Sequence, residues 1–223
     1  TEVRTIKKDG SIVWVRVYSQ PIWDEDKNKL VGINGAVQDI TERKKAEEEI
    51  QKSAREFEAL YESARDFTLH RDPYVILRTI TDRACTLFNT LNAFVYIYDP
   101  DTDELVLRFN KEFPGSLGLR LKPGEGLSGI VGQKKVPMFI NDYQSWPGRL
   151  PAYEDSQIAA IMCVPMLYAG QLIGVLGIHE NHPSEITFSE EDAHFLSLFA
   201  SQAAAAVYSA DLFEQLRQNA AEL

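Results

Sequence analysis

The chain has 223 residues, of which 44% are apolar and 25% charged, and its formal net charge is −10. This composition excludes a disordered or collagen-like chain. An acidic chain without basic runs also argues against nucleic acid as a partner, because phosphate binding needs clustered Lys and Arg. Cys85 and Cys163 lie in apolar runs, which predicts buried thiols in a reducing compartment. Since no apolar stretch reaches about 18 residues, we expect a cytoplasmic protein without direct membrane contact.

Residues 1–40 have the pattern of antiparallel strands. Asp9-Gly10 favours a hairpin turn, residues 12–18 are rich in β-branched and aromatic side chains, and a third apolar run follows at 30–37. Three strands without a covering helix do not form a stable domain. We therefore expect this region to belong to a larger domain or to pack on a partner.

From Thr41 the pattern becomes helical, and residues 41–70 are predicted to form a linker or signalling helix. Its apolar residues recur in steps of four and three, as in a coiled-coil seam that includes Ile50, Phe57 and Ala64. A single amphipathic helix lying on its own domain has the same pattern. Fewer than three heptads leave both interpretations open.

Residues 71–188 alternate between helical and strand-like segments, and residues 189–223 predict a final helix. Asp72-Pro73 is a helix start signal, and Ser189 to Asp192 resembles a capping box. The final helix carries a stripe with Phe199, Ala206 and Phe213. The predicted fold class is α+β, with an antiparallel sheet flanked by helices and a partial sheet and helical linkers before it. The strand-like runs are 93–98, 105–109, 138–140, 159–167 and 172–178.

Four sequence strings occur in the order found in GAF domains. They are KPGEGLSGIVG at 122–132, VPMFIND at 136–142, AIMCVPM followed by GQLIGVL within 160–176, and FSEED at 188–192. Residues 57–207 therefore resemble a GAF domain. The resemblance implies a sheet that packs on the terminal helices with one face and lines a ligand cavity with the other.

The N-terminal region resembles the C-terminal half of a PAS domain, which ends in a PAC motif. The resemblance covers residues 1–43 and rests on KDGS at 8–11, on Trp14-Val15 and on DITER at 39–43. It implies a section of a PAS–GAF sensor protein such as a sensor histidine kinase, although a diguanylate cyclase or a phosphatase shares this order. At the end of the third strand we expect Thr41 to cap the helix and Asp39 to pair with Arg43 or Lys44. This corner would couple the strands to the helix.

Enzyme motifs are scarce, and we expect no catalytic domain in this chain. The sequence has no G-x-x-x-x-G-K-[ST], G-x-S-x-G or C-x-x-C motif. Two histidines, His179 and His182, lie close together, but a metal site needs further ligands and we expect none. The GAF-type sulfoxide reductases use a reactive thiol. Cys85 and Cys163 lie in apolar runs, which favours a packing role for both over such a reactive role. The signature of nucleotide-binding GAF domains is only partly present, so the cofactor or ligand stays unknown.

The strand at 93–98 is aromatic on one face, with Phe94 and Tyr96, and aliphatic on the other. Since small aliphatic residues suit helix packing, the aromatic face is assigned to a ligand cavity. A filled core would have the same pattern, and a volume above about 300 Å³ would favour a ligand site. The further walls predicted are Phe109, Ile140, Asp142, Trp146, Met162 and His179.

Three functions follow from these patterns. The first is a cytoplasmic sensory module whose GAF domain binds a small ligand and biases a parallel homodimer of the helices at 41–68 and 195–220. The second is a dimerisation and relay segment whose cavity is filled by its own side chains. The third, which the packing roles of the cysteines disfavour, is an enzyme such as a GAF-type sulfoxide reductase, and it would need a reactive Cys85 or Cys163.

Overall fold

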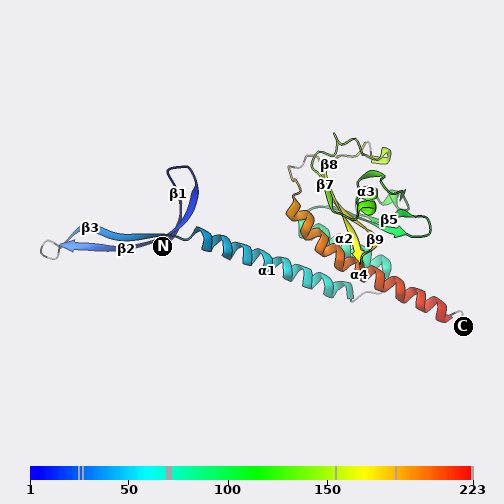
Figure 1. Cartoon of the computed structure of the whole chain (residues 1–223), viewed down its shortest axis with the longest axis horizontal. Coiled ribbons are helices and arrows are strands. Elements are labelled where there is room, and N and C mark those ends of the chain that lie inside the picture. Colours follow the sequence, from blue (N-terminus) through cyan, green and yellow to red (C-terminus); the bar gives the residue numbers. More distant parts are fainter. Residues whose placement is uncertain (25, 27, 69–71, 154, 184, 222–223) are drawn as a thin grey trace. The chain divides into compact units, whose positions relative to one another are not determined.

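A computed structural model describes the chain except for residues 25, 27, 69–71, 154, 184 and 222–223. The side chains of residues 55–57, 59–68, 114 and 218–221 also lie outside the description, and these include the predicted seam residues Phe57 and Ala64. The chain divides into two compact units, Thr1–Phe57 and Glu58–Leu223. Helix α1, Thr41–Thr68, contains the boundary between the units (Figure 1).

The first unit holds a three-stranded antiparallel sheet in the order β1-β2-β3. Its strands are β1 (Glu2–Ile6), β2 (Ile12–Asp24) and β3 (Lys29–Asp39). Gly10 has a φ of +87° in the predicted hairpin turn, a conformation that favours glycine. Val13, Val15 and Ile40 are buried, whereas most other apolar side chains of this sheet are exposed. The described part of this unit therefore has a small core.

The corner between β3 and α1 is built differently from the expectation. Thr41 is the first residue of α1, and its amide N–H donates to Asp39 Oδ1 over 3.0 Å, so the cap comes from Asp39. The Thr41 hydroxyl accepts the Trp14 amide N–H of β2 over 3.0 Å. Asp39 pairs with Lys7 at 3.4 Å and not with Arg43 or Lys44. The end of β3, the start of α1 and strand β2 are therefore linked by hydrogen bonds at Trp14.

The second unit is built on a six-stranded antiparallel sheet in the order β6-β5-β4-β9-β8-β7. The helices are α2 (Pro73–Phe88), α3 (Gly126–Lys134) and α4 (Glu190–Ala221). Short 3-10 turns lie at Pro114–Ser116 and Pro151–Tyr153. The strands are β4 (Asn92–Asp99), β5 (Glu104–Asn110), β6 (Arg120–Leu121), β7 (Met138–Ile140), β8 (Ile158–Tyr168) and β9 (Gln171–Asn181).

The start signals read from the sequence form as predicted. Asp72 Oδ1 accepts the Tyr74 amide N–H over 2.8 Å, with Pro73 at the first helical position. At α4, the Ser189 amide N–H donates to Asp192 Oδ2 over 2.8 Å, and the Asp192 amide N–H donates to Ser189 Oγ over 3.2 Å. These reciprocal bonds satisfy donors that a helix start leaves unpaired.

Each face of the large sheet covers its own apolar cluster. Helices α2 and α4 pack on one face, where Val95, Met162, Leu176 and Phe199 are buried together. Helix α3 and the loops around it cover the other face, with Phe94, Tyr96, Leu127 and Tyr143. The α+β class with an antiparallel sheet and flanking helices is thereby confirmed, and Figure 1 shows α4 running along the sheet.

Helix α4 is apolar on two opposite sides, and this corrects the predicted dimer stripe. Phe199 has no exposed surface and lies in the core against the sheet, while Ala206 is half-buried beside that core. Phe213, further along, is 44% exposed. A second apolar stripe, with Leu198, Leu212 and Leu216, faces solvent. Phe199 thus packs within its own domain and offers no surface to another copy.

In the described part of the chain, none of the helices combines the length and apolar character needed to cross a membrane.

Candidate functional site

A small cavity lies on the sheet face opposite α2 and α4. Strands β4, β8 and β9 form its floor, and α3 and two loops form its walls. The lining is mainly aromatic and aliphatic, with a few neutral polar groups. The residues that line it are Phe94, Tyr96, Asn110, Phe113, Leu127, Ser128, Tyr143, Leu150, Tyr153, Ile158, Ile161 and His179.

Three of the predicted wall residues meet in this cavity. Phe94 and Tyr96 project from β4, and their rings are 5.8 Å apart in an edge-to-face arrangement. His179 projects from β9, where it is almost fully buried with its ring 6.2 Å from that of Phe94. Gly177 makes room for this arrangement, because a Cβ there would overlap the Phe94 ring.

Two predicted wall residues lie on the helix side of the sheet instead. Strand β5 carries a bulge at Arg108, since Leu107 pairs with Tyr96 and Phe109 pairs with Val95. The extra residue reverses the alternation, so Phe109 faces the helices and Asn110 faces the cavity. Met162 also belongs to the helix-side core. These two positions of the predicted site are corrected.

The other three predicted residues border the region without lining the cavity. Ile140 and Trp146 are half-buried and pack against the same apolar cluster. Asp142 is exposed, and its Oδ1 accepts the Ser145 amide N–H over 3.2 Å. A carboxylate used in this way stabilises the turn after β7.

Sequence reasoning missed the loop residues of the cavity. Asn110 Oδ1 accepts the amide N–H groups of Glu112 and Phe113 over 3.1 and 3.0 Å, which turns the chain back over the sheet. The Phe113 ring then stacks on His179 at 6.3 Å and contacts the Tyr153 ring at 5.9 Å. Phe113 and Tyr153 close the cavity from two separate loops. The signal in the sequence is Asn110 itself, because an Asn side chain often accepts the amide N–H two residues later and so forms a turn. This signal predicts the turn but not the face of the sheet over which the chain returns.

Burial favours the neutral forms of three polar groups of the cavity, the imidazole of His179 and the phenols of Tyr96 and Tyr143. Burial lowers the pKa of His179 to about 4, against the weaker effect of the Asn181 hydrogen bond. Burial also raises the pKa of Tyr143 to about 12 and that of Tyr96 further. Among the lining residues that the structure describes, no Lys or Arg is present to bind an anion.

The cysteines lack the properties of catalytic thiols. Cys163 is fully buried, its Sγ lies 3.6 Å from Ser128 Oγ, and burial raises its pKa to about 12. Burial also raises the pKa of Cys85, which lies in the helix-side core. A redox or nucleophilic thiol needs access and a lowered pKa. The geometry does not favour thiol chemistry at either position.

The cavity volume is about 30 Å³. Small-molecule sites usually have about 300–1,000 Å³, whereas a cavity of this size holds no more than a few water molecules. In this conformation the side chains fill the site. A ligand larger than a few atoms needs the rings of Phe113 and Tyr153 to move.

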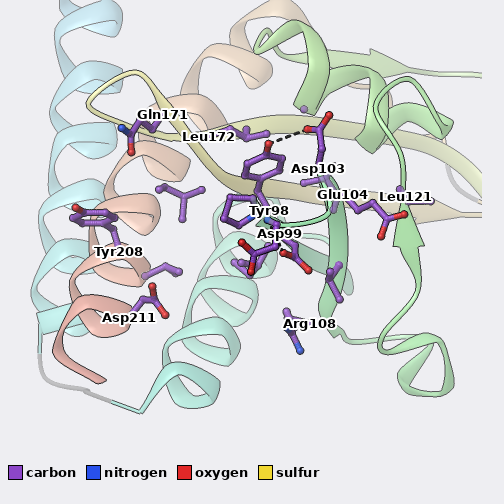
Figure 2. A pocket seen from close by; sticks show the side chains of 18 of the residues that line it. Tyr98, Asp99, Asp103, Glu104, Arg108, Leu121, Gln171, Leu172, Tyr208 and Asp211 are labelled. Atoms are coloured by element: carbon purple, nitrogen blue, oxygen red, sulfur yellow. Dashed lines mark hydrogen bonds between the residues drawn. The ribbon is translucent and has the colours of Figure 1, made fainter. Parts of the chain in front are cut away.

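A larger, open groove of about 1370 Å³ lies between the β4–β5 turn and the ends of α2 and α4. Figure 2 shows carboxylates around Tyr98, whose hydroxyl donates to Asp103 over 2.8 Å. Arg120 pairs with Asp99 at 3.1 Å and with Glu104 at 3.0 Å. These carboxylates are thus engaged in contacts that hold the turn, and the closed cavity is the better candidate site.

Comparison with known proteins identifies the fold. The GAF domain family matches residues 70–207. The Caenorhabditis elegans protein described as "Probable 3',5'-cyclic phosphodiesterase pde-5" is 29% identical over 154 residues, which are 62% of this chain. The chain spans only 19% of the length of that relative.

Solved structures show the same fold at low sequence identity. The GAF domain of a phosphoenolpyruvate-protein phosphotransferase from Acinetobacter has a TM-score of 0.63 at 19% identity, covering 72% of this chain and 98% of that one. The corresponding Coxiella burnetii domain has a TM-score of 0.63 at 24% identity, with 72% and 96% covered. Free methionine-R-sulfoxide reductase from Neisseria meningitidis has a TM-score of 0.59 at 22% identity, with 72% and 93% covered. The six-stranded antiparallel sheet, the flanking helices and the matched residues together place this chain in the GAF domain family.

Proposed function

We propose that this chain is a regulatory segment of a signalling protein, in which the GAF unit responds to a small ligand and its helices relay the response. GAF domains are sensory and regulatory modules of signalling proteins. The observation that carries the proposal is the aromatic cavity closed by Phe113 and Tyr153. Both residues lie in loops, and loops rearrange at less cost than strands. Their movement would enlarge the cavity without breaking the sheet.

The alternative is a dimerisation and relay segment that binds no ligand. The cavity volume of about 30 Å³ favours this alternative, because the site is already filled. In that case Phe113 and Tyr153 are permanent parts of the core. The two candidates differ in one respect, which is whether a molecule can displace these rings.

The relay in both cases requires a homodimer, and the exposed stripe of α4 supports a parallel one. Leu198, Leu212 and Leu216 recur at helical spacing on the side away from the sheet. Ile50 on α1 is likewise exposed, at 69%. Apolar stripes of this kind bury against a second helix in coiled coils. Phe199 has no part in this proposal.

For the longer protein we propose a cytoplasmic sensor histidine kinase, with a diguanylate cyclase or a phosphatase as the alternative output. In this assignment residues 1–40 are the end of a PAS domain, 41–70 the signalling helix, 71–188 the GAF sheet and loops, and 189–223 the C-terminal helix. The support is the DITER string, which runs from the last strand into α1. The boundary between the compact units falls inside the proposed signalling helix.

Sedimentation and native mass spectrometry test the proposal on the full chain. We expect a dimer at tens of micromolar and a monomer for Leu212→Glu, because a charge in an apolar seam is costly. Arg217→Glu, at an exposed position five residues further on and so on a different side of α4, is the matched control and should stay dimeric. A monomeric wild-type chain would refute the relay. A small molecule retained in native spectra separates the ligand-binding candidate from the ligand-free one.

A further inference from the structure

Two tyrosine hydroxyls that line the aromatic cavity lack an acceptor. Tyr96 and Tyr143 are only 2% and 3% exposed, and both line the cavity. Within the described residues, neither hydroxyl donates a hydrogen bond of normal length to a protein acceptor. A buried tyrosine hydroxyl usually has a partner, and an unsatisfied polar group needs an explanation.

Both hydroxyls reach the open space of the cavity. The described side-chain atoms that lack both a partner and accessible surface belong to Glu112, Glu180 and Gln202. The oxygens of Tyr96 and Tyr143 are not among them, so each oxygen touches accessible space. Because these side chains are otherwise buried and line the cavity, that space is the cavity itself.

The two phenols are held by the sheet and by the turn beside it. Tyr96 is a central residue of β4, where it pairs with Leu107 of β5 and with Val175 of β9. Tyr143 follows β7, and its amide N–H donates to the Ala159 carbonyl oxygen over 2.9 Å. The two donors are therefore fixed in place, in contrast to the loops that carry Phe113 and Tyr153.

Neighbouring groups do not use up the hydroxyl hydrogens. Burial raises the pKa of Tyr96, and the Tyr153 phenol close to it raises this pKa further. Two hydroxyls that share a hydrogen bond use one hydrogen and leave the other without an acceptor. At Tyr143 the nearby backbone group is the Leu150 amide, which is a donor and lowers the pKa of this phenol against the effect of burial. One hydrogen near Tyr96 and one at Tyr143 are thus left over.

The rest of the cavity wall favours an uncharged molecule. Its apolar side chains include Phe94, Leu127 and Ile161, and no described lining residue is a Lys or Arg. An anion without a cationic partner is costly to bury, whereas a neutral acceptor is not. Because the hydroxyls are donors and the walls are apolar, they fit a molecule with a neutral oxygen acceptor on an apolar body.

We propose that the cavity binds a small uncharged carbonyl compound whose oxygen accepts hydrogen bonds from the hydroxyls of Tyr96 and Tyr143. The present volume of about 30 Å³ has room for little more than the carbonyl group. The body of the ligand takes the place of the Phe113 ring, which contacts the Tyr153 ring at 5.9 Å. This inference rests on the proposed response of the GAF unit to a ligand, and it names the class of that ligand.

Calorimetry on the full chain at pH 7.5 tests the proposal with acetophenone, α-methylstyrene and benzoate. The first two have nearly the same shape, but only acetophenone has an acceptor oxygen, and benzoate has acceptor oxygens with a negative charge. Acetophenone should bind about fivefold or more tightly than α-methylstyrene, because it satisfies hydroxyls that are otherwise unpaired. Equal binding of α-methylstyrene, or tighter binding of benzoate, would overturn the proposal.

Tyr96→Phe and Tyr143→Phe remove one hydroxyl each and keep the ring. Each should weaken acetophenone binding about fivefold and leave the affinity for α-methylstyrene unchanged. Tyr74→Phe is the matched control, since Tyr74 is 58% exposed on α2 and lies outside this cavity. Unchanged acetophenone affinity in both cavity variants would overturn the assignment to these hydroxyls.

Infrared spectroscopy gives a second readout that a loss of packing does not produce. The carbonyl stretch of bound acetophenone should lie at lower wavenumber in the wild type than in the double variant Tyr96→Phe/Tyr143→Phe, because a hydrogen bond weakens the carbonyl bond. An identical band in both proteins would contradict the proposed contacts.

Phe113→Leu opens the space that the ligand body needs, and it should tighten acetophenone binding several-fold. If acetophenone binds neither the wild type nor this variant, the hydroxyls face water alone and the inference fails. The oligomeric state and any molecule retained in native spectra are measured without these probes. Failure of this inference therefore leaves the proposed function standing, and a monomeric wild-type chain refutes the proposed relay whatever the probes do.

Discussion

The buried imidazole of His179 predicts how the stability of the GAF unit depends on pH. Burial lowers its pKa from the ordinary 6.5 to about 4. Between these pH values the unfolded chain binds a proton that the folded chain does not bind. The contribution of the neutral His179 to the free energy of unfolding is therefore fully present above about pH 6.5 and is lost as the pH falls towards 4. Since one pKa unit equals about 1.4 kcal/mol, the complete loss is about 3 kcal/mol.

Urea unfolding at pH 7.5, 5.5 and 4.5 measures this loss. Replacing Trp14 and Trp23 by phenylalanine leaves Trp146, in the GAF unit, as the single tryptophan reporter. His179→Gln is the reference, because glutamine does not titrate and can still hydrogen-bond to Asn181. Relative to this reference, the parent should lose about 2.5 kcal/mol of unfolding free energy between pH 7.5 and 4.5.

The outcome that contradicts this reasoning is equally definite. If the parent and His179→Gln lose stability in parallel, burial does not lower the pKa of the His179 imidazole. If the parent gains stability relative to the variant as the pH falls, the folded state binds the proton and Glu112 pairs with an imidazolium. A steep loss confined to the parent confirms the neutral, buried histidine.

Three further predictions concern packing and the strand-to-helix corner. Phe199→Ala should lower the free energy of unfolding in urea by about 3–5 kcal/mol, because its ring lies wholly inside the domain core. A loss below about 1 kcal/mol would contradict this burial of Phe199. Thr41→Val should lower the stability of the first unit by about 1 kcal/mol and speed hydrogen exchange at the Trp14 amide, whereas Thr41→Ser preserves both. Gly174→Ala should cost about 2 kcal/mol, because a Cβ there collides with the Tyr96 carbonyl oxygen; an unchanged melting temperature would contradict the close approach of β4 and β9.

Local signals in the sequence predicted the type and order of most elements, although not the two-residue strand β6. The capping residues Asp72, Ser189 and Asp192 form the hydrogen bonds expected of them. Such signals work because a cap or a hairpin turn is decided within a few residues, by short-range sterics and hydrogen bonds. The ordered GAF strings likewise predicted the family without knowledge of any contact.

The faces of the strands depended on pairing that the sequence does not display. Alternation places Phe109 on the side of Leu107, but the bulge at Arg108 reverses it. On β8 the alternation is uninformative, because the strand is buried on both faces and apolar almost throughout. Met162 could therefore not be assigned to a face from its neighbours in the chain.

Helix α4 shows that apolar residues spaced three and four apart do not reveal which side of a helix packs on the sheet. Phe199 and Leu212 both belong to apolar stripes, yet the first stripe packs on the sheet and the second faces solvent. Any helix that buries one side has this spacing, and it does not name the partner.

The cavity itself was the least predictable feature. His179, Phe113 and Tyr153 come from one strand and two separate loops, and their ring contacts join residues far apart in the sequence. The sequence alone determined most of the elements, their order and the family, because these depend on short-range preferences. Only the tertiary structure decided which side chains meet, because that depends on the relative placement of loops and sheet.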